Sequence, residues 1–329
     1  MDTRRLGRTQ LEVTTLSFGA AGIGNLYRPI SRADAEATLQ SAWDGGVRYF
    51  DTAPRYGHGL SERRLGDFLR DKPRESYVVS TKVGRLLAPV PESEVPDYGF
   101  VDPLPFRADY DYSYDGIMRS VEFSLARLGL NRVEILFVHD IGVLTHGAEE
   151  NARHFRDLME GGMKALDELK SSGAVKAIGL GVNETQVCLD VMDRAPIDCI
   201  LLAGRYTLLD RSAEKELIAR CRDAGTSLVI GGVFNSGILA TGAAPGAPFD
   251  YEPASADILR RVEGMEAIAK RHGVSLAAAA LEFPMKSDVV ATVLVGTAKP
   301  SSMQRNLDLL SETIPDAAWA EFDALALRP

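Results

Sequence analysis

The feature that most constrains the fold of this chain is a regular alternation of short apolar runs with amphipathic stretches. Each apolar run is short enough to be a strand buried on both faces, and the stretches between them have a helical period. The alternation predicts eight βα units. The expected strands are Leu16–Phe18, Val47–Asp51, Tyr77–Lys82, Val133–His139, Val175–Gly181, Asp198–Ala203, Ser227–Gly231 and Val289–Val295. The expected helices are Arg32–Trp43, Glu62–Leu69, Gly116–Leu128, Met159–Lys170, Glu184–Met192, Ser212–Asp223, Ser255–Arg271 and Ser301–Leu310.

Two α/β architectures fit this alternation: an open, doubly wound sheet and a closed (β/α)8 TIM barrel. An open sheet that binds a dinucleotide normally carries G-x-G-x-x-G after its first strand, and the run Gly19–Gly24 lacks that spacing. The repeat number, the length of 329 residues and the absence of a linker favour a single barrel domain over residues 1–329. We also expect an N-terminal β-hairpin, with strands Thr3–Leu6 and Leu11–Val13 on either side of a turn.

The longest insertion runs from Gly84 to Asp115 and is rich in Pro, Asp and Tyr. It follows the third expected strand, so it emerges at the C-terminal ends of the strands, where the active sites of barrels are built. A structureless loop of this length in a compact domain is usually functional or disordered. We therefore expect a long loop that forms a wall of the substrate pocket, with a solvated loop as the alternative.

Charge and composition exclude several classes of function. The formal net charge of −9 argues against nucleic acid or an anionic membrane as a partner, because binding either one needs a positive field. No segment reaches the roughly 20 apolar residues of a membrane-spanning helix, and the first residues lack the apolar core of a signal peptide. Cys188, Cys199 and Cys221 have no metal-binding spacing and are expected to be reduced core residues, so no metal site is predicted. We expect a soluble, cytoplasmic protein.

Four side chains that can do chemistry lie at or just after predicted strand ends: Asp51, Tyr56, Lys82 and His139. A single residue of any of these types is more often a structural or an exposed residue. A barrel, however, would bring all four side chains to one rim. A free tyrosine titrates near about 10 and is a poor base at neutral pH. A neighbouring ammonium favours the phenolate, a carboxylate can hold that ammonium, and an imidazole can position the reacting oxygen. The set predicts a tyrosine acid/base whose pKa is lowered by about two to three units.

The segment Asp51–Glu62, the strand end Ser80–Lys82 and the pair Val138–His139 resemble the aldo-keto reductase superfamily. The first of these is specific, because many of its positions match in order, and the likeness extends over nearly the whole chain. The resemblance implies a barrel fold, a nicotinamide cofactor, either NAD or NADP, and oxidoreductase activity on a small-molecule substrate.

The same resemblance implies a role for each candidate residue. Tyr56 would be the general acid/base, Lys82 would lower its pKa, Asp51 would hold Lys82, and His139 would orient the substrate. The residues that would bind the cofactor are Gly19, Asn183, Gly232, Val233, Phe234, Asn235, Gly237, Leu239, Gly296, Thr297, Lys299, Ser302, Arg305 and Asn306.

Four positions bear on how the cofactor would be held. Ala203 stands where the family has a glutamine, and Gly231 where it usually has the aromatic residue that stacks on the nicotinamide, so another residue must cover that ring. Gly296 and Ser302 stand where members that prefer NADP usually carry basic residues. Each lost charge-assisted contact to a ribose phosphate removes roughly 1.5–3 kcal/mol. We therefore expect NAD, and with it oxidation, with NADP as the alternative.

Within the superfamily, the segments Phe18–Gly24 and Arg205–Asp210 resemble the bacterial aldose 1-dehydrogenases of the L-fucose or D-threo-aldose type. The same branch contains pyridoxal 4-dehydrogenases, and the motifs do not separate the two. Both substrates are cyclic hemiacetals, which lose a proton and a hydride to give a lactone. The other functions considered are a broad NADPH-dependent aldehyde or ketone reductase and a nicotinamide-sensing binding subunit without turnover.

Overall fold

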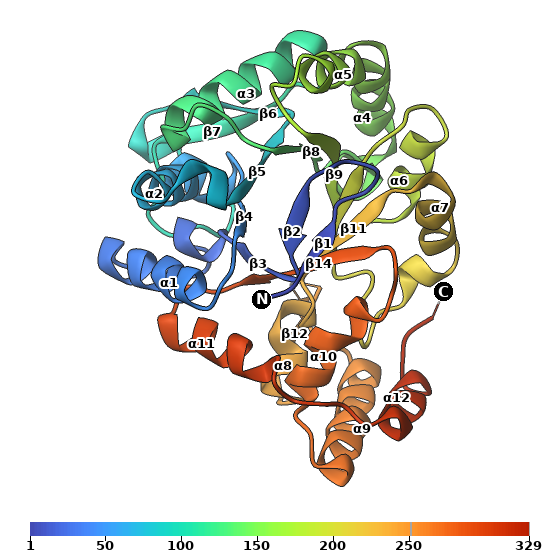
Figure 1. Cartoon of the computed structure of the whole chain (residues 1–329). Helices are drawn as coiled ribbons and strands as arrows, with labels where there is room; N and C mark the ends of the chain where they lie inside the picture. The colour runs from blue at the N-terminus through green and yellow to red at the C-terminus, as the bar shows by residue number, and fades with distance from the viewer. Residues whose placement is uncertain (251, 329) are drawn as a thin grey trace.

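The computed structural model describes residues 1–250 and 252–328 and contains a closed barrel of eight parallel strands surrounded by helices (Figure 1). Each barrel strand pairs with the next barrel strand along the chain, and the last pairs with the first. The barrel strands are β3 (Leu16–Gly19), β4 (Tyr49–Asp51), β5 (Val78–Val83), β8 (Ile135–His139), β9 (Ala177–Val182), β10 (Cys199–Ala203), β11 (Ser227–Gly231) and β14 (Val290–Gly296). The predicted (β/α)8 TIM-barrel fold is confirmed.

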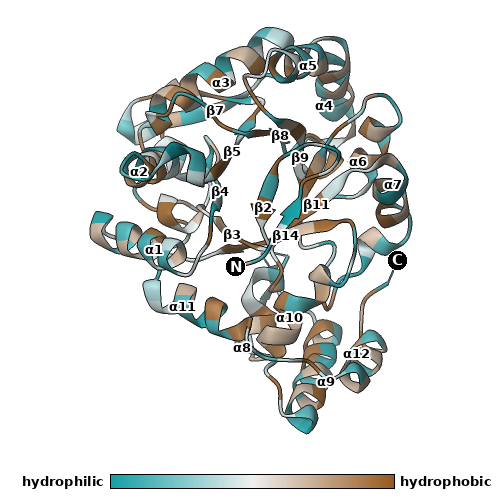
Figure 2. Cartoon of the chain, viewed as in Figure 1, coloured by the Kyte–Doolittle hydropathy of each residue, from teal (hydrophilic) through white to brown (hydrophobic). Residues whose placement is uncertain are grey.

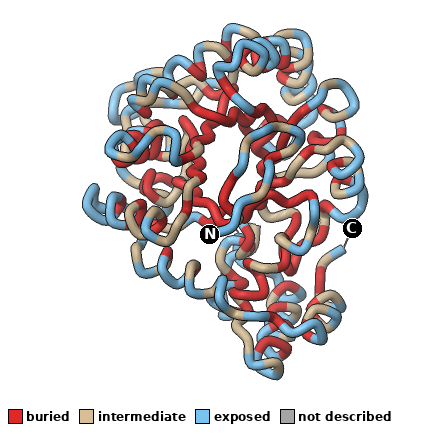
Figure 3. The backbone as a smooth tube through the Cα atoms, in the orientation of Figure 1, coloured by how far each residue is buried: buried red, intermediate tan, exposed pale blue. Residues whose placement is uncertain are grey.

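Helices cover the outside of the barrel and turn polar residues to solvent, while the strands are apolar and buried (Figures 2 and 3). The helices are α1 (Arg32–Asp44), α2 (Leu60–Leu69), α3 (Tyr114–Leu128), α4 (Val143–Asp157), α5 (Met163–Ser171), α6 (Gln186–Met192), α7 (Leu217–Ala224), α8 (Ile238–Thr241), α9 (Ala256–His272), α10 (Leu276–Met285), α11 (Pro300–Leu309) and α12 (Asp316–Asp323).

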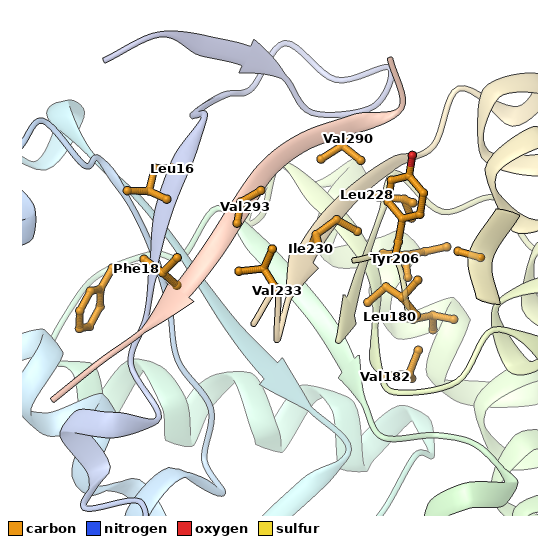
Figure 4. Close-up of a cluster of buried hydrophobic side chains, with 14 of the residues drawn as sticks. Leu16, Phe18, Leu180, Val182, Tyr206, Leu228, Ile230, Val233, Val290 and Val293 are labelled. Atoms are coloured by element: carbon orange, nitrogen blue, oxygen red, sulfur yellow. The ribbon is translucent and has the colours of Figure 1, made fainter. Parts of the chain in front are cut away.

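The core has two layers, because successive residues of a strand point to opposite faces. One set of side chains, which includes Tyr49 and Phe137, fills the inside of the barrel. The alternate set, which includes Leu180 and Ile230, packs outward against the helices (Figure 4). A strand buried on both faces reads as a continuous apolar run, which explains why the sequence pattern located the strands.

The predicted N-terminal hairpin is present as β1 (Thr3–Arg5) paired antiparallel with β2 (Glu12–Thr14), and it lies across the barrel opening in Figure 1. Leu6 and Val13 join the inner core. The Gly7 backbone N–H donates a hydrogen bond to Ser227 Oγ over 2.8 Å, at the first residue of β11. The hairpin therefore closes the N-terminal end of the barrel, and the opposite end is left for a site.

The insertion after β5 is not the structureless loop that we expected. Its flanks form a second antiparallel hairpin, in which β6 (Arg85–Pro89) pairs with β7 (Phe106–Tyr110). Along β7, partly buried residues alternate with exposed ones, which is the period-two pattern of a half-buried strand. The prolines between the two strands hid this short pattern in the sequence.

Four helices were missed by the periodicity argument: α4, the short α8, α10 and α12. Helix α4 is largely exposed, with His154 its one buried residue among those the structure describes. Helix α10 is apolar on all sides, which removes the contrast between faces. Helix α4 continues through a π-helical turn at Leu158–Gly162 into α5. Only the second half of this helical region between β8 and β9 was predicted.

Candidate active site

The four candidate catalytic side chains converge at the C-terminal end of the barrel. Asp51 is the last residue of β4, Lys82 lies near the end of β5, and His139 is the last residue of β8. These three strands are neighbours in the barrel. Tyr56 follows β4 in the short helical turn Tyr56–Gly59. The structure therefore brings together the residues that the sequence placed on one rim.

The turn that carries Tyr56 depends on glycine. Gly57 has φ of 62° and His58 has φ of 53°, both in the left-handed region. A Cβ atom added to Gly57 would lie 2.4 Å from the carbonyl oxygen of Gly24, so the turn packs directly against the segment that follows β3. This close packing fixes where the tyrosine ring can lie.

Below Tyr56, Lys82 and Asp51 form a buried ion pair. The Lys82 ammonium donates hydrogen bonds to Asp51 Oδ2 over 2.6 Å and to the carbonyl oxygen of Thr52 over 2.9 Å. Ser80 Oγ donates to the other carboxylate oxygen of Asp51 over 2.7 Å. Burial lowers the pKa of Lys82, but Asp51 and Tyr56 together raise it further than burial lowers it. Lys82 therefore remains a cation inside the barrel.

The Lys82 Nζ atom lies 4.8 Å from the centroid of the Tyr56 ring. We expected this cation to lower the pKa of Tyr56. The expectation is wrong for the net shift, because burial raises the pKa of Tyr56 more than Lys82 lowers it, and Asp51 adds to the rise. At neutral pH, Tyr56 is therefore a protonated phenol and can donate a proton. Lys82 limits the rise that burial causes.

The imidazole of His139 lies edge-on to Tyr56, with ring centroids 6.1 Å apart and an interplanar angle of 90°. Burial, followed by the charges of Arg85 and Lys82, lowers the pKa of His139 well below its usual value. The ring is therefore neutral. Its Nδ1 atom is buried and has no hydrogen-bond partner among the described residues. A neutral imidazole beside the phenol can form a hydrogen bond with a substrate oxygen without adding charge to the site.

A cleft of about 390 Å³ opens above Tyr56 and His139. The hairpin insertion supplies one of its walls, and the insertion is tied to the segment after β3 by an antiparallel bridge between Leu26 and Phe100. The insertion therefore lines the cleft through Tyr98 and Phe100, as expected, and the binding of a substrate there remains a prediction. The other residues that line the cleft are Ala21, Leu26, Tyr27, Arg55, Tyr98, Phe100, Asp140 and Asn183.

The sequence argument missed the charged residues of this cleft. Arg55 and Asp140 both line it. Arg85, at the start of β6, donates a hydrogen bond to the Asp140 carboxylate and is 2% exposed. A signal was available for two of the three, because Arg55 directly precedes Tyr56 and Asp140 directly follows His139. The position of Arg85 depends on the hairpin and could not be deduced without it.

Several residues predicted to hold the cofactor lie around the same end of the barrel. Gly19 and Gly296 face each other across β3 and β14, and Asn183 follows β9 and lines the cleft. Ala203 and Gly231 face each other across β10 and β11. The two departures from the family pattern are thus neighbours, and together they leave this part of the rim with small side chains only.

The segment Gly232–Leu239, expected to cover a pyrophosphate, is held by its own side chains. Val233 and Leu239 are buried in the outer core. Asn235 accepts a hydrogen bond from Thr207 Oγ1 over 2.6 Å and donates one to the carbonyl oxygen of Gly204 over 3.2 Å. Any contact of these three residues with a cofactor would therefore come from their backbone. Gly232, which is exposed, and Phe234 and Gly237, which are half-buried, remain predicted contacts.

The segment that resembles an adenosine site leads from β14 into α11. Lys299 is the N-cap residue of α11 and is exposed, as is Arg305 further along the helix, while Ser302 is half-buried. Thr297 Oγ1 accepts a hydrogen bond from the Lys299 backbone N–H over 3.2 Å, and Asn306 is buried. A helix N-terminus flanked by cations and a hydroxyl suits a phosphate. The residues present therefore fit a nucleotide.

The described residues were also searched for metal sites, membrane-spanning helices and reactive cysteines. Nowhere in residues 1–250 and 252–328 do three or more His, Cys, Asp or Glu side chains form a group that could hold a metal ion. Over the same ranges, every helix is too short or too polar to cross a membrane. The three cysteines are free and buried, and burial raises the pKa of the Cys221 thiol to about 12.

A closed barrel with a phenol, a charged amine, a carboxylate and a neutral imidazole at its C-terminal rim defines a class of barrel oxidoreductases. The chain belongs to the Aldo/keto reductase family, whose model matches residues 15–327. It is an oxidoreductase, and aldo-keto reductases use nicotinamide cofactors.

Similar proteins agree with this assignment. The chain is 46% identical to a pyridoxal 4-dehydrogenase of Microbacterium luteolum, over 97% of this chain and 95% of the relative. It is 39% identical to a D-threo-aldose 1-dehydrogenase of a Pseudomonas species, over 97% and 96%. The holo form of an aldo-keto reductase from Bacillus halodurans superposes with a TM-score of 0.79 at 23% identity, over 99% and 97%, which supports the fold.

Proposed function

We propose that this enzyme, as one barrel domain, oxidises a cyclic hemiacetal to a lactone with NAD as its cofactor. The observation that carries the proposal is the arrangement of Tyr56 above the buried Lys82–Asp51 pair, with the neutral His139 beside it. Two relatives that match nearly the whole chain are named for pyridoxal and for D-threo-aldose. Both compounds form cyclic hemiacetals, so the proposed reaction is the one that they share.

Each of these residues has a different role in the proposed reaction. Tyr56, as phenolate, takes the proton of the hemiacetal hydroxyl, while His139 donates a hydrogen bond to the same oxygen. The carbon–oxygen double bond of the lactone forms as the carbon–hydrogen bond breaks. The bound nicotinamide supplies the hydride acceptor. Lys82 stabilises the phenolate, and Asp51 holds Lys82 in place.

The cofactor would lie across the rim from Asn183 to α11. The Asn183 side chain would bind the carboxamide of the nicotinamide, because it lines the cleft beside Tyr56 and His139. The N-terminus of α11, with Lys299 and Ser302, would hold the adenosine end. NAD is the proposed form, because Gly296 and Ser302 offer no positive charge to a ribose phosphate.

A substrate screen tests the proposal directly. The purified enzyme would be incubated with NAD or NADP and with L-fucose, other aldoses or pyridoxal between about pH 7 and about pH 10. We expect reduced cofactor to accumulate with NAD and at least one hemiacetal, and a lactone to be found by mass spectrometry. The proposal fails if no hemiacetal is oxidised with either cofactor while simple aldehydes are reduced. That result would favour a broad aldehyde or ketone reductase instead.

A further inference from the structure

The cleft above Tyr56 holds an arrangement of charge that the reaction itself does not need. Arg55 lines the cleft with its guanidinium carbon 4.8 Å from the centroid of the Tyr98 ring. Asp140 lines the same cleft, has a side chain that is 23% exposed, and is bound from behind by the buried Arg85. A cation and an anion thus border the space where a substrate would lie.

The charges of this region do not balance. Lys82 is paired with Asp51, and Arg85 is paired with Asp140. Among the described residues, no ion pair joins Arg55 to a carboxylate, and its side chain is half-buried. Burial and the charge of Arg85 lower the pKa of Arg55, and the charge of Asp140 offsets only part of that fall. A substrate that carries a negative charge would compensate the charge of Arg55, whereas a neutral sugar would not.

From this geometry we infer that Arg55 and Asp140 form a charged subsite for a hemiacetal fused to a zwitterionic aromatic ring. The inference rests on the proposed function and narrows its substrate class. Arg55 would bind an ionised ring oxygen, and Asp140 would accept a hydrogen bond from a protonated ring nitrogen. Tyr98 and Phe100 would pack against the ring face. Pyridoxal has this chemistry, because its ring oxygen is ionised and its ring nitrogen is protonated near neutral pH. Aldoses have neither group.

The first experiment compares Arg55→Gln with the unchanged enzyme on pyridoxal and on L-fucose. We expect kcat/KM for pyridoxal to fall about 10- to 100-fold, the loss of one charge-assisted hydrogen bond. For any aldose that is turned over, the loss should be smaller, so that the preference for pyridoxal over the aldose falls about 10-fold or more. Arg55→Lys should recover part of the pyridoxal activity. Arg107→Gln, which removes an exposed guanidinium from β7, is the matched control and should leave both substrates unaffected.

The second experiment removes the charge from the substrate. In 3-O-methylpyridoxal the ring oxygen cannot ionise, but the hemiacetal still forms. The unchanged enzyme should use this analogue about 10- to 100-fold less well than pyridoxal, and Arg55→Gln should then cause little further loss. If Arg55→Gln costs as much with the methylated analogue as with pyridoxal, Arg55 does not bind the ring oxygen and the inference is wrong.

The role of Asp140 is tested with Asp140→Asn. We expect KM for pyridoxal to rise about 10-fold or more with a smaller change in kcat, because a contact to a distant ring atom affects binding more than the chemical step. Equal losses for pyridoxal and for aldoses would contradict the subsite while leaving the hemiacetal reaction intact. Failure to oxidise any hemiacetal would instead contradict the proposed function, so the two failures can be told apart.

Discussion

Lys82 Nζ lies 2.6 Å from Asp51 Oδ2, and the side chains of the two residues are only 2% and 1% exposed. Two strands that are neighbours in the barrel supply this pair, and Ser80 and Thr52 satisfy further hydrogen bonds around it. Burying an ion pair costs desolvation free energy, and the attraction between the two charges offsets that cost only narrowly. Its position beneath Tyr56 therefore indicates a role in chemistry more than in stability.

Asp51→Asn should leave the Lys82 ammonium buried without its counter-charge. We expect the free energy of unfolding to fall by about 3–5 kcal/mol, the usual cost of removing one partner of a buried pair. Urea denaturation followed by circular dichroism measures this change. Asp67→Asn, which breaks an exposed pair with Arg32, is the control and should change stability by less than about 1 kcal/mol. Equal losses of unfolding free energy in both variants would show that the buried pair contributes no more to stability than the exposed pair does.

Tyr56→Phe removes the hydroxyl that is proposed to carry the proton but keeps the ring. We expect kcat for hemiacetal oxidation to fall by about 10²- to 10⁴-fold, with the dissociation constant for the cofactor unchanged in a fluorescence titration. Tyr114→Phe, which removes an exposed hydroxyl bonded to Glu168, is the matched control. An active Tyr56→Phe enzyme would overturn the assignment of the acid/base.

The raised pKa of Tyr56 predicts how the rate depends on pH. Oxidation needs the phenolate, whose fraction grows about tenfold per unit of pH below the pKa. The rate of oxidation should therefore rise from pH 7 to pH 9, whereas the rate of the reverse reduction, which needs the phenol, should stay nearly constant over the same range. Because Lys82 lowers the pKa of Tyr56, Lys82→Met should move the oxidation profile to higher pH. A profile that is flat over this range, or unmoved by Lys82→Met, would contradict this account.

The preference for NAD can be tested at α11. We expect NAD to bind more tightly than NADP to the unchanged enzyme in a fluorescence titration. Ser302→Arg should improve NADP binding about 10-fold or more by adding a charge-assisted contact to the ribose phosphate. Gln304→Arg, on the exposed face of the same helix, adds the same charge elsewhere and serves as the control. Tight NADP binding by the unchanged enzyme would reverse the assignment.

Gly57→Ala tests the turn that positions Tyr56. The new Cβ would lie 2.4 Å from the carbonyl oxygen of Gly24, at a residue whose φ is 62°. We expect a loss of stability of about 1–3 kcal/mol and a larger relative loss of activity, because Tyr56 would move. Gly129→Ala has the same φ and no atom within 4 Å of the new Cβ, so it separates backbone strain from the clash. Equal losses of activity in Gly57→Ala and Gly129→Ala would show that the contact with Gly24 does not position the tyrosine.

The sequence was sufficient for the barrel and for the four residues of the rim. Strands buried on both faces appear as apolar runs, and the residue after such a run lies at the rim by geometry alone, as His139 does. Two of the missed helices were missed for different reasons. Helix α10 is apolar apart from Glu282, so its faces show little contrast, and α4 is largely exposed and buries only His154 among the described residues.

Electrostatic properties were less accessible to sequence reasoning. The neighbours of Tyr56 could be named, but the balance between its burial and the charge of Lys82 requires coordinates. The pairing of Arg85 with Asp140 joins residues that are far apart in the chain, through a hairpin that was expected to be irregular. The roles of the cofactor residues rest on resemblance and remain predictions.

The hairpin insertion leaves the barrel after β5 and returns to it at α3, and its residues Tyr98 and Phe100 line the cleft. Enzymes on this scaffold could therefore acquire new substrates by exchanging one contiguous stretch of chain, while the nucleotide end and the proton-transfer apparatus stayed as they are. For protein engineering, residues 84 to 115 are the natural segment to transplant between relatives.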